Sequence, residues 1–209
     1  MGLLGPARLR PLEDAGRGET TRNAILLAAA REFRDKGYSG ARLADIATRV
    51  GMKAGSLYYH FESREALVQS VMDEGLRLTH AAVVDRLSGL AASSSHRERL
   101  EAAIVTHLEL VLANEDIASA TIKLIWQAPP EIREGQLVRQ RAYGALWKQL
   151  LSEARDAGAI RGDLDLSVVR MATMGALNWA ADWYAPGRMT PGEIARDIAA
   201  MILGGLAPI

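Results

Sequence analysis

The chain of 209 residues contains no cysteine, which excludes disulfides, zinc fingers and thiol chemistry. It also lacks a long apolar run. The longest one, Met171–Ala181, contains Asn178 and lies between two charged residues, so it is too short and too polar to span a bilayer. Prolines and arginines interrupt the first residues, which therefore do not resemble a signal peptide. We expect a cytoplasmic protein with no membrane partner.

The chain also lacks net charge, because 25 basic residues balance 25 acidic ones. The charges are unevenly distributed, however. Residues 1–65 carry 11 Lys and Arg against 8 Asp and Glu, whereas the remainder carries 14 against 17. A basic N-terminal part on an acidic body suggests that one end of the molecule approaches phosphate groups.

Apolar residues recur at helical spacing along most of the chain, and no segment shows the alternation of a strand. Residues 1–18 hold glycines and prolines without such a pattern, and we expect a flexible arm there. The spacing predicts about nine helices and an all-α fold. They are expected over residues 20–37, 43–50, 54–60, 63–87, 100–112, 117–126, 131–157 and 166–184, and from residue 190 onward.

The segment 43–58 has the features of a helix-turn-helix, in which two short helices cross steeply around a tight turn. Ala47 is small enough to let the helices approach, and Gly51 tolerates the positive φ that the turn needs. An apolar seam between the two helices is formed by Ile46, Val50, Met52 and Leu57. A plain helical hairpin is the alternative, but the spacing, the seam and the polar outer face all favour the helix-turn-helix.

The second short helix presents polar side chains, which are those of Lys53, Ser56, Tyr59 and His60. Groups of this kind contact phosphates and base edges when a helix lies in the major groove. Tyr58 and Tyr59 point about 100° apart on an α-helix, so that one can be buried while the other meets DNA. Double-stranded operator DNA is therefore the expected partner.

Several short motifs follow one another along residues 21–67. They are Ala29-Ala30, Phe33, Gly37-Tyr38, Ile46-Ala47, Gly51, Gly55-Ser56-Leu57-Tyr58, His60-Phe61 and Glu65-Ala66-Leu67. This series resembles the DNA-binding domain of the TetR/AcrR family of bacterial regulators. Three positions depart from the family pattern: Arg42 stands where a capping Thr or Ser is usual, Arg64 replaces Lys, and Lys53 replaces a common Ser.

The resemblance implies a regulator without enzymatic activity or cofactor, most commonly a repressor, that binds a palindromic operator. It implies base or sugar contacts by Ser56 and Tyr59, and either a base or a phosphate contact by Lys53. Phosphate contacts are implied for Arg42, Tyr58, His60 and Arg64, assisted by backbone amides near Gly55. We expect a three-helix DNA-binding domain over residues 19–65 and a ligand-binding and dimerisation domain over residues 66–209.

A homodimer is expected because helix-turn-helix proteins usually bind two half-sites about 34–36 Å apart. The last two helices offer an interface, and by resemblance they would form a four-helix bundle with their mates. The small-residue face comprises Ala172, Gly175, Ala176 and Ala180. The apolar stripe on the final helix comprises Ile194, Ile198, Met201, Ile202 and Leu206. Both faces could instead belong to the core of a single chain.

All four tryptophans lie in the second part of the chain, and aromatic, apolar pockets are typical of ligand sensors. The candidate ligand-binding residues are Trp126, Tyr143, Trp147, Met171, Met174, Trp179 and Trp183. Core packing is the alternative for each of them. Residues 175–187 loosely resemble TetR-like regulators of fatty-acid and sterol breakdown, which implies a small apolar effector, with an acyl-CoA thioester as one candidate. Arg139 and Arg141 are candidates for a CoA phosphate, or else solvated surface.

Other classes of function are less well supported. The four histidines are scattered, and neither a metal motif nor a nucleophile elbow is present, so we expect no metal site and no catalytic residues. A regulator of efflux or other catabolic genes that senses a drug-like molecule is an alternative. A helical lipid carrier or interaction module is another, but it leaves the polar face of residues 53–60 unexplained.

Overall fold

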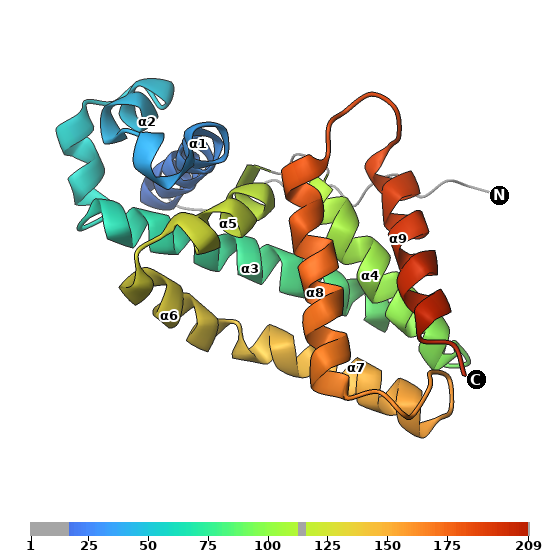
Figure 1. Ribbon diagram of the computed structural model, residues 1–209. Coiled ribbons are helices and arrows are strands. Elements are labelled where there is room, and N and C mark those ends of the chain that lie inside the picture. Colours follow the sequence, from blue (N-terminus) through green and yellow to red (C-terminus); the bar gives the residue numbers. More distant parts are fainter. Residues whose placement is uncertain (1–16, 113–115, 209) are drawn as a thin grey trace.

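The computed structural model describes residues 17–112 and 116–208, which form helices connected by short turns (Figure 1). The helices are α1 (Arg17–Gly40), α2 (Leu43–Arg49), the 3₁₀ helix η1 (Ala54–Tyr59), α3 (Arg64–Ser88), α4 (His96–Leu112), α5 (Asp116–Gln127), α6 (Pro130–Arg139), α7 (Arg141–Asp156), α8 (Leu166–Trp183) and α9 (Pro191–Gly205). No strand occurs among the described residues, and the all-α prediction is confirmed. The predicted arm lies outside them except for its last two residues, which begin α1.

Local chemistry explains where several helices begin. The side chain of Ser63 accepts a hydrogen bond from the backbone N–H of Ala66 and caps α3. At the start of α9, Thr190 and Glu193 form a reciprocal capping box with Pro191 at the first helical position. Both features satisfy backbone N–H groups that have no partner within the helix. In the part of the chain that the structure describes, no helix is long and apolar enough to cross a membrane.

The predicted single helix over residues 131–157 is wrong, because the structure breaks it at Gln140 into α6 and α7. The two parts pack against different neighbours. The fully buried Gln136 of α6 donates to the backbone oxygen of Met72 on α3, and Arg139 forms an ion pair with Asp73 at 2.5 Å. Helix α7 instead packs on α4 and α8. Arg139 is thus engaged with α3, while Arg141 is exposed.

The buried side chains form two hydrophobic cores, and α3 contributes to both. Its first half, including Val68 and Met72, belongs to a core shared with α1, α2, η1 and α5. Its second half, including Val83 and Leu87, belongs to a larger core formed with α4, α7, α8 and α9. Figure 1 shows α3 running from the side of α1 and α2 to the side of α4 and α9, with α6 and α7 below it.

Helix α5 packs very closely on α3 at Gly75. The Oγ1 atom of Thr121 donates to the backbone oxygen of Ile117 at 2.8 Å, and its side chain is buried. A Cβ atom placed on Gly75 would lie 2.1 Å from that Oγ1 atom and 2.9 Å from the oxygen of Ile117. The absence of a side chain at residue 75 is therefore what permits the α3–α5 contact.

Helices α8 and α9 each pack on α4, whereas they make few contacts with each other (Figure 1). Both leave large apolar side chains in solvent. The exposed ones are Val168, Met171, Trp179 and Trp183 on α8 and Met201 on α9. Of the predicted interface residues, Ala172 and Gly175 are exposed, Ala176, Ile198 and Ile202 are half-buried, and Ala180, Ile194 and Leu206 belong to the core of the chain.

Candidate DNA-binding surface and sensor core

The turn between α2 and η1 has the geometry that the sequence predicts. Gly51 has a φ of 69°, in the left-handed region that favours glycine. The backbone N–H of Met52 donates to the oxygen of Ala47 at 2.9 Å. Ala47, Ile46 and Leu57 are buried in the seam, and Val50 and Met52 are half-buried against it.

A buried carboxylate joins α1 to α2 behind this turn. Glu32 is almost completely buried and forms ion pairs with Arg49 at 2.5 Å and Lys36 at 2.7 Å. Lys36 also pairs with Asp45 of α2 at 2.8 Å. Burial raises the pKa of Glu32, but hydrogen bonds from Lys36 and Arg49 outweigh it, so that the pKa lies below its ordinary value. The ionised carboxylate therefore contributes to holding α2 on α1.

Replacing Glu32 with Gln is expected to lower the free energy of unfolding by about 1–2 kcal/mol, because charge-assisted hydrogen bonds are lost. The contribution of Glu32 is complete above the unfolded pKa and disappears as the pH falls through its lower folded pKa. Guanidinium unfolding at pH 7 and pH 3 checks this. The difference between the two proteins should be smaller at pH 3 than at pH 7, and an equal difference at both pH values would contradict this role.

Helix η1 carries an exposed face made of predicted DNA-binding residues. Tyr59 is 90% exposed and Tyr58 is 57% exposed. Both tyrosines thus face solvent, although an α-helix would allow one of them to be buried. Lys53 and Gly55 are also exposed, whereas Ser56 and His60 are half-buried on the same segment.

The two predicted arginine contacts differ in their surroundings. Arg42 is exposed at the N-terminus of α2 and makes no side-chain cap there. Arg64 is half-buried, donates to the backbone oxygen of Tyr38 and lies over the Tyr38 ring at 4.2 Å. Gln127 of α5 accepts from the backbone N–H of Tyr38 at 2.8 Å. Arg64 therefore supports the end of α1, and its contact with phosphate stays a prediction.

The seven predicted ligand-binding residues are not brought together. Tyr143 and Trp147 are buried in the larger core, and Met174 is half-buried against it. Trp126 is 75% exposed at the end of α5, and Met171, Trp179 and Trp183 are exposed on α8. These seven side chains are thus divided between the core and the surface, and their contacts with a ligand stay predictions.

The larger core contains polar side chains that are hydrogen-bonded to one another. Nδ1 of His107 lies 2.7 Å from the hydroxyl of Tyr143, and Nε2 lies 3.1 Å from Oδ1 of Asn178. Because Oδ1 only accepts, Nε2 donates to it and Nδ1 accepts from the phenol, which requires a neutral imidazole. Burial lowers the pKa of His107 to about 4 and raises the pKa of Tyr143 above its ordinary value. Tyr143 was a candidate from the sequence, but the three residues lie far apart in the chain and nothing in the sequence indicated that His107 and Asn178 meet it.

Two open clefts flank the C-terminal end of α8. One, of about 360 Å³, lies where α1 meets α4, α5 and α8, and includes Arg34, Lys123 and Tyr184. The other, of about 410 Å³, lies towards α9 and includes Trp183 and Ile198. Trp183 is the one predicted ligand-binding residue that borders either cleft. Among the described residues no cluster of potential metal ligands occurs.

Comparison with known proteins identifies both parts of the chain. Residues 25–71 match the family described as bacterial regulatory proteins, tetR family. Residues 93–206, more than half of the chain, match the family described as tetracyclin repressor-like, C-terminal domain. The HTH-type transcriptional repressor KstR2 of Mycolicibacterium smegmatis is 27% identical over 197 residues, which cover 88% of this chain and 90% of that protein.

Two solved structures support the same assignment. AibR in complex with isovaleryl coenzyme A and operator DNA has a TM-score of 0.75 and 28% identity, covering 87% of this chain and 97% of AibR. The TetR-family regulator PfmR of Thermus thermophilus has a TM-score of 0.74 and 25% identity, covering 86% of this chain and 97% of PfmR. The helix-turn-helix, the all-helical second part and these matches agree: the chain belongs to the TetR family of transcriptional regulators.

Proposed function

We propose that the protein is a cytoplasmic, homodimeric repressor that binds a palindromic operator and releases it when a small apolar acyl compound binds. Residues 19–65 would read the DNA, and residues 66–209 would bind the effector and form the dimer. The exposed tyrosines of η1 carry the proposal, because Tyr59 is 90% exposed at the end of a helix whose N-cap, Lys53, is also exposed, and so has no role in packing. Such an exposed polar and aromatic face suits contact with DNA.

The exposed apolar residues of α8 and α9 support a homodimer. Trp179, Met171 and Met201 are each exposed by 60% or more on neighbouring helices. Large exposed apolar patches usually mark interfaces, and a second copy of the same surface would bury them around a twofold axis. Two recognition helices would then meet successive major grooves.

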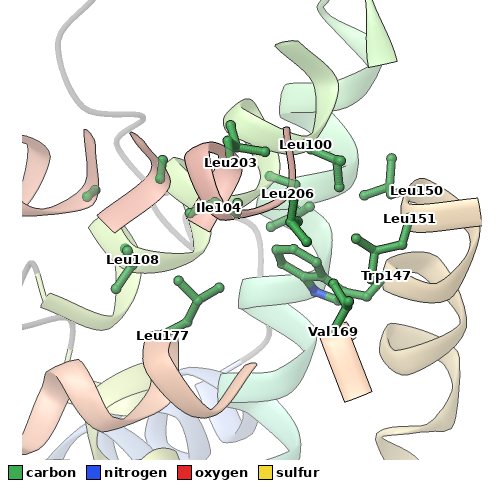
Figure 2. Close-up of a cluster of buried hydrophobic side chains, with 14 of the residues drawn as sticks. Leu100, Ile104, Leu108, Trp147, Leu150, Leu151, Val169, Leu177, Leu203 and Leu206 are labelled. Carbon is green, nitrogen blue, oxygen red and sulfur yellow. The ribbon is translucent and has the colours of Figure 1, made fainter. Parts of the chain in front are cut away.

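One relative supports an acyl effector and another supports repression. AibR was crystallised with isovaleryl coenzyme A and operator DNA, and its chain matches this one along almost its whole length. KstR2 is named as a repressor. The larger core, formed by α3, α4, α7, α8 and α9 and called the sensor core from here on, is an apolar cluster that includes Trp147 (Figure 2). Such surroundings suit an apolar acyl group more than a polar metabolite.

The decisive experiment selects operators from random duplex DNA with the purified protein and measures affinity by fluorescence anisotropy. Tyr59→Ala is expected to weaken operator binding about tenfold to thirtyfold, because a contact with DNA is lost. Tyr59→Phe, which keeps the ring, separates the roles of ring and hydroxyl. If Tyr59→Ala binds the operator with unchanged affinity and unfolds at the same denaturant concentration as the original protein, the assignment of η1 as the helix that contacts DNA is contradicted.

A second measurement concerns salt. If Lys53 contacts phosphate in each half-site, Lys53→Ala should reduce the slope of log affinity against log salt concentration by about 2 for the dimer. Lys148→Ala, which changes an exposed lysine on α7, is the matched control and should keep the slope. Equal slopes for the two variants would place Lys53 away from phosphate.

Effector release is tested by adding isovaleryl-CoA, longer acyl-CoA thioesters and the corresponding free acids to the protein–operator complex. Release by a thioester supports the acyl compound proposed here. Release only by unrelated drug-like molecules would favour the alternative of an efflux regulator, and would leave the DNA-binding function in place.

A further inference from the structure

The sensor core contains a group that we call the polar nest, defined as His107 of α4, Tyr143 and Trp147 of α7, and Asn178 of α8. It is enclosed by apolar residues, and Trp147 is only 1% exposed. Figure 2 shows the Trp147 ring among Leu206, Val169 and Leu151. The rings of His107 and Tyr143 each lie about 6 Å from that of Trp147, in edge-to-face arrangements. Three sensor helices therefore meet at one buried polar point.

One donor in the polar nest lacks a well-formed hydrogen bond. The indole N–H of Trp147 is buried and has no acceptor at hydrogen-bonding geometry. Its weaker interaction with the Tyr143 hydroxyl lowers the pKa of that phenol, against the larger rise that burial causes. Most buried polar groups in folded proteins have a partner, and the exceptions call for an explanation. An unpaired donor in an apolar core costs free energy in the empty protein, and that cost disappears when a ligand supplies an acceptor.

The neighbouring groups restrict which acceptor fits. Tyr143 donates to His107, and His107 donates to Asn178, so these hydrogens are already engaged. The imidazole is neutral, and no cation belongs to the polar nest. A carboxylate would lose its hydration without gaining a counter-charge, which is strongly unfavourable. A neutral carbonyl oxygen, as in a thioester, ester or ketone, needs only one donor and suits this environment.

The polar nest is close to the surface on one side. Asn178 and Met174 of α8 are half-buried, and so is His80 of α3, whose ring centre lies 5.4 Å from that of Tyr143. Solvent therefore already reaches Asn178, a member of the polar nest, and His80, whose ring lies near that of Tyr143.

We propose that the polar nest recognises the carbonyl oxygen of the effector, with the indole N–H of Trp147 as the donor, and so selects neutral acyl compounds over free acids. This inference rests on the proposed function for the existence of an effector, and it adds the residue and the functional group that are recognised. Because α4, α7 and α8 all contribute, a bound carbonyl would also change how these three helices are held together.

The test observes the indole N–H directly. In the ¹H–¹⁵N NMR spectrum of the full-length protein the four tryptophans give four indole signals, and Trp147→Phe assigns one of them. The probes are isovaleryl-CoA, its thioether analogue isopentyl-CoA, which lacks the carbonyl, free isovalerate and 4-methyl-2-pentanone, a ketone without CoA. Isovaleryl-CoA and the ketone are expected to shift the Trp147 proton downfield, whereas the thioether and isovalerate should leave it in place.

A binding comparison provides the second readout. Trp147→Phe should weaken the affinity for isovaleryl-CoA about tenfold more than that for the thioether, because the lost ring volume affects both ligands whereas the lost hydrogen bond affects only the carbonyl compound. Trp126→Phe, at an exposed tryptophan, is the matched control. A merely structural role of Trp147 would change both affinities alike.

The outcomes separate this inference from the proposed function. If isovaleryl-CoA releases the operator but the Trp147 signal stays in place, the inference is overturned and the proposed function stands. If the ketone shifts the signal while no thioester releases the operator, the acyl-CoA effector is wrong and recognition of a carbonyl stands. If no carbonyl probe shifts the signal up to its solubility limit, the inference is overturned whatever the operator does.

Discussion

Lowering the pH from 7 to 4 should reduce the free energy of unfolding by about 3 kcal/mol through His107 alone. Its pKa is about 4 in the folded protein, against 6.5 ordinarily, because burial disfavours the imidazolium. The unfolded chain therefore takes up a proton on this residue at a higher pH than the native state does. Stability is complete above pH 6.5, falls between 6.5 and 4, and changes no further through this residue below 4.

Guanidinium unfolding at pH 7.5, 6.0 and 5.0, at one protein concentration, measures this effect. His107→Gln keeps a hydrogen-bonding side chain but does not titrate, so its stability should depend much less on pH in this interval. His96→Gln, at a half-buried histidine outside the core, tests whether loss of any histidine has the same result. If the original protein shows no loss of stability between pH 7.5 and 5.0, His107 is not held neutral by its surroundings.

Gly75→Ala is expected to destabilise the protein by about 2–3 kcal/mol, near the upper end of the usual cost of overpacking. The new Cβ atom would lie 2.1 Å from Oγ1 of Thr121 and 2.9 Å from the backbone oxygen of Ile117. The side chain of Thr121 can be removed, but the carbonyl of Ile117 moves only if α5 moves. Because α5 also contacts α1, the DNA-binding part should be affected as well.

The control is Gly144→Ala on α7, where the nearest atom to a new Cβ belongs to a flexible arginine at 3.6 Å. There the better helix propensity of alanine should raise stability by up to about 1 kcal/mol. Thr121→Ala should rescue part of the Gly75→Ala loss, since it removes one of the two clashes. Equal unfolding midpoints for Gly75→Ala and Gly144→Ala in denaturant would show that α5 can move away from α3 at little cost.

The features predicted correctly from the sequence are those decided by residues close together in the chain. The left-handed Gly51, the seam of Ile46 and Leu57, and the capping box of Thr190 and Glu193 each follow from a residue type and its immediate neighbours. Periodicity likewise identified nearly every helix. The exposed tyrosines of η1 were identified by motif, and their actual contacts with DNA are left to experiment.

Features decided by tertiary packing were not predictable in the same way. The break at Gln140 involves neither glycine nor proline, and it arises because α6 is tied to α3 while α7 packs elsewhere. Residue type alone also cannot separate Trp147, which is buried, from Trp126, which is 75% exposed. His107 meets Tyr143 and Asn178 only because three helices converge, and no local pattern reveals such a meeting.

The contribution of α3 to both cores affects how the protein unfolds. A helix whose two halves each lie in a different core cannot be released by loosening only one of them, so the two parts of the chain are expected to unfold as one cooperative unit. The amides of Val71 and Val83, one in each core, should then exchange with deuterium at closely similar rates, set by global opening. The DNA-binding part and the ligand-binding part would thereby have the same free energy of unfolding.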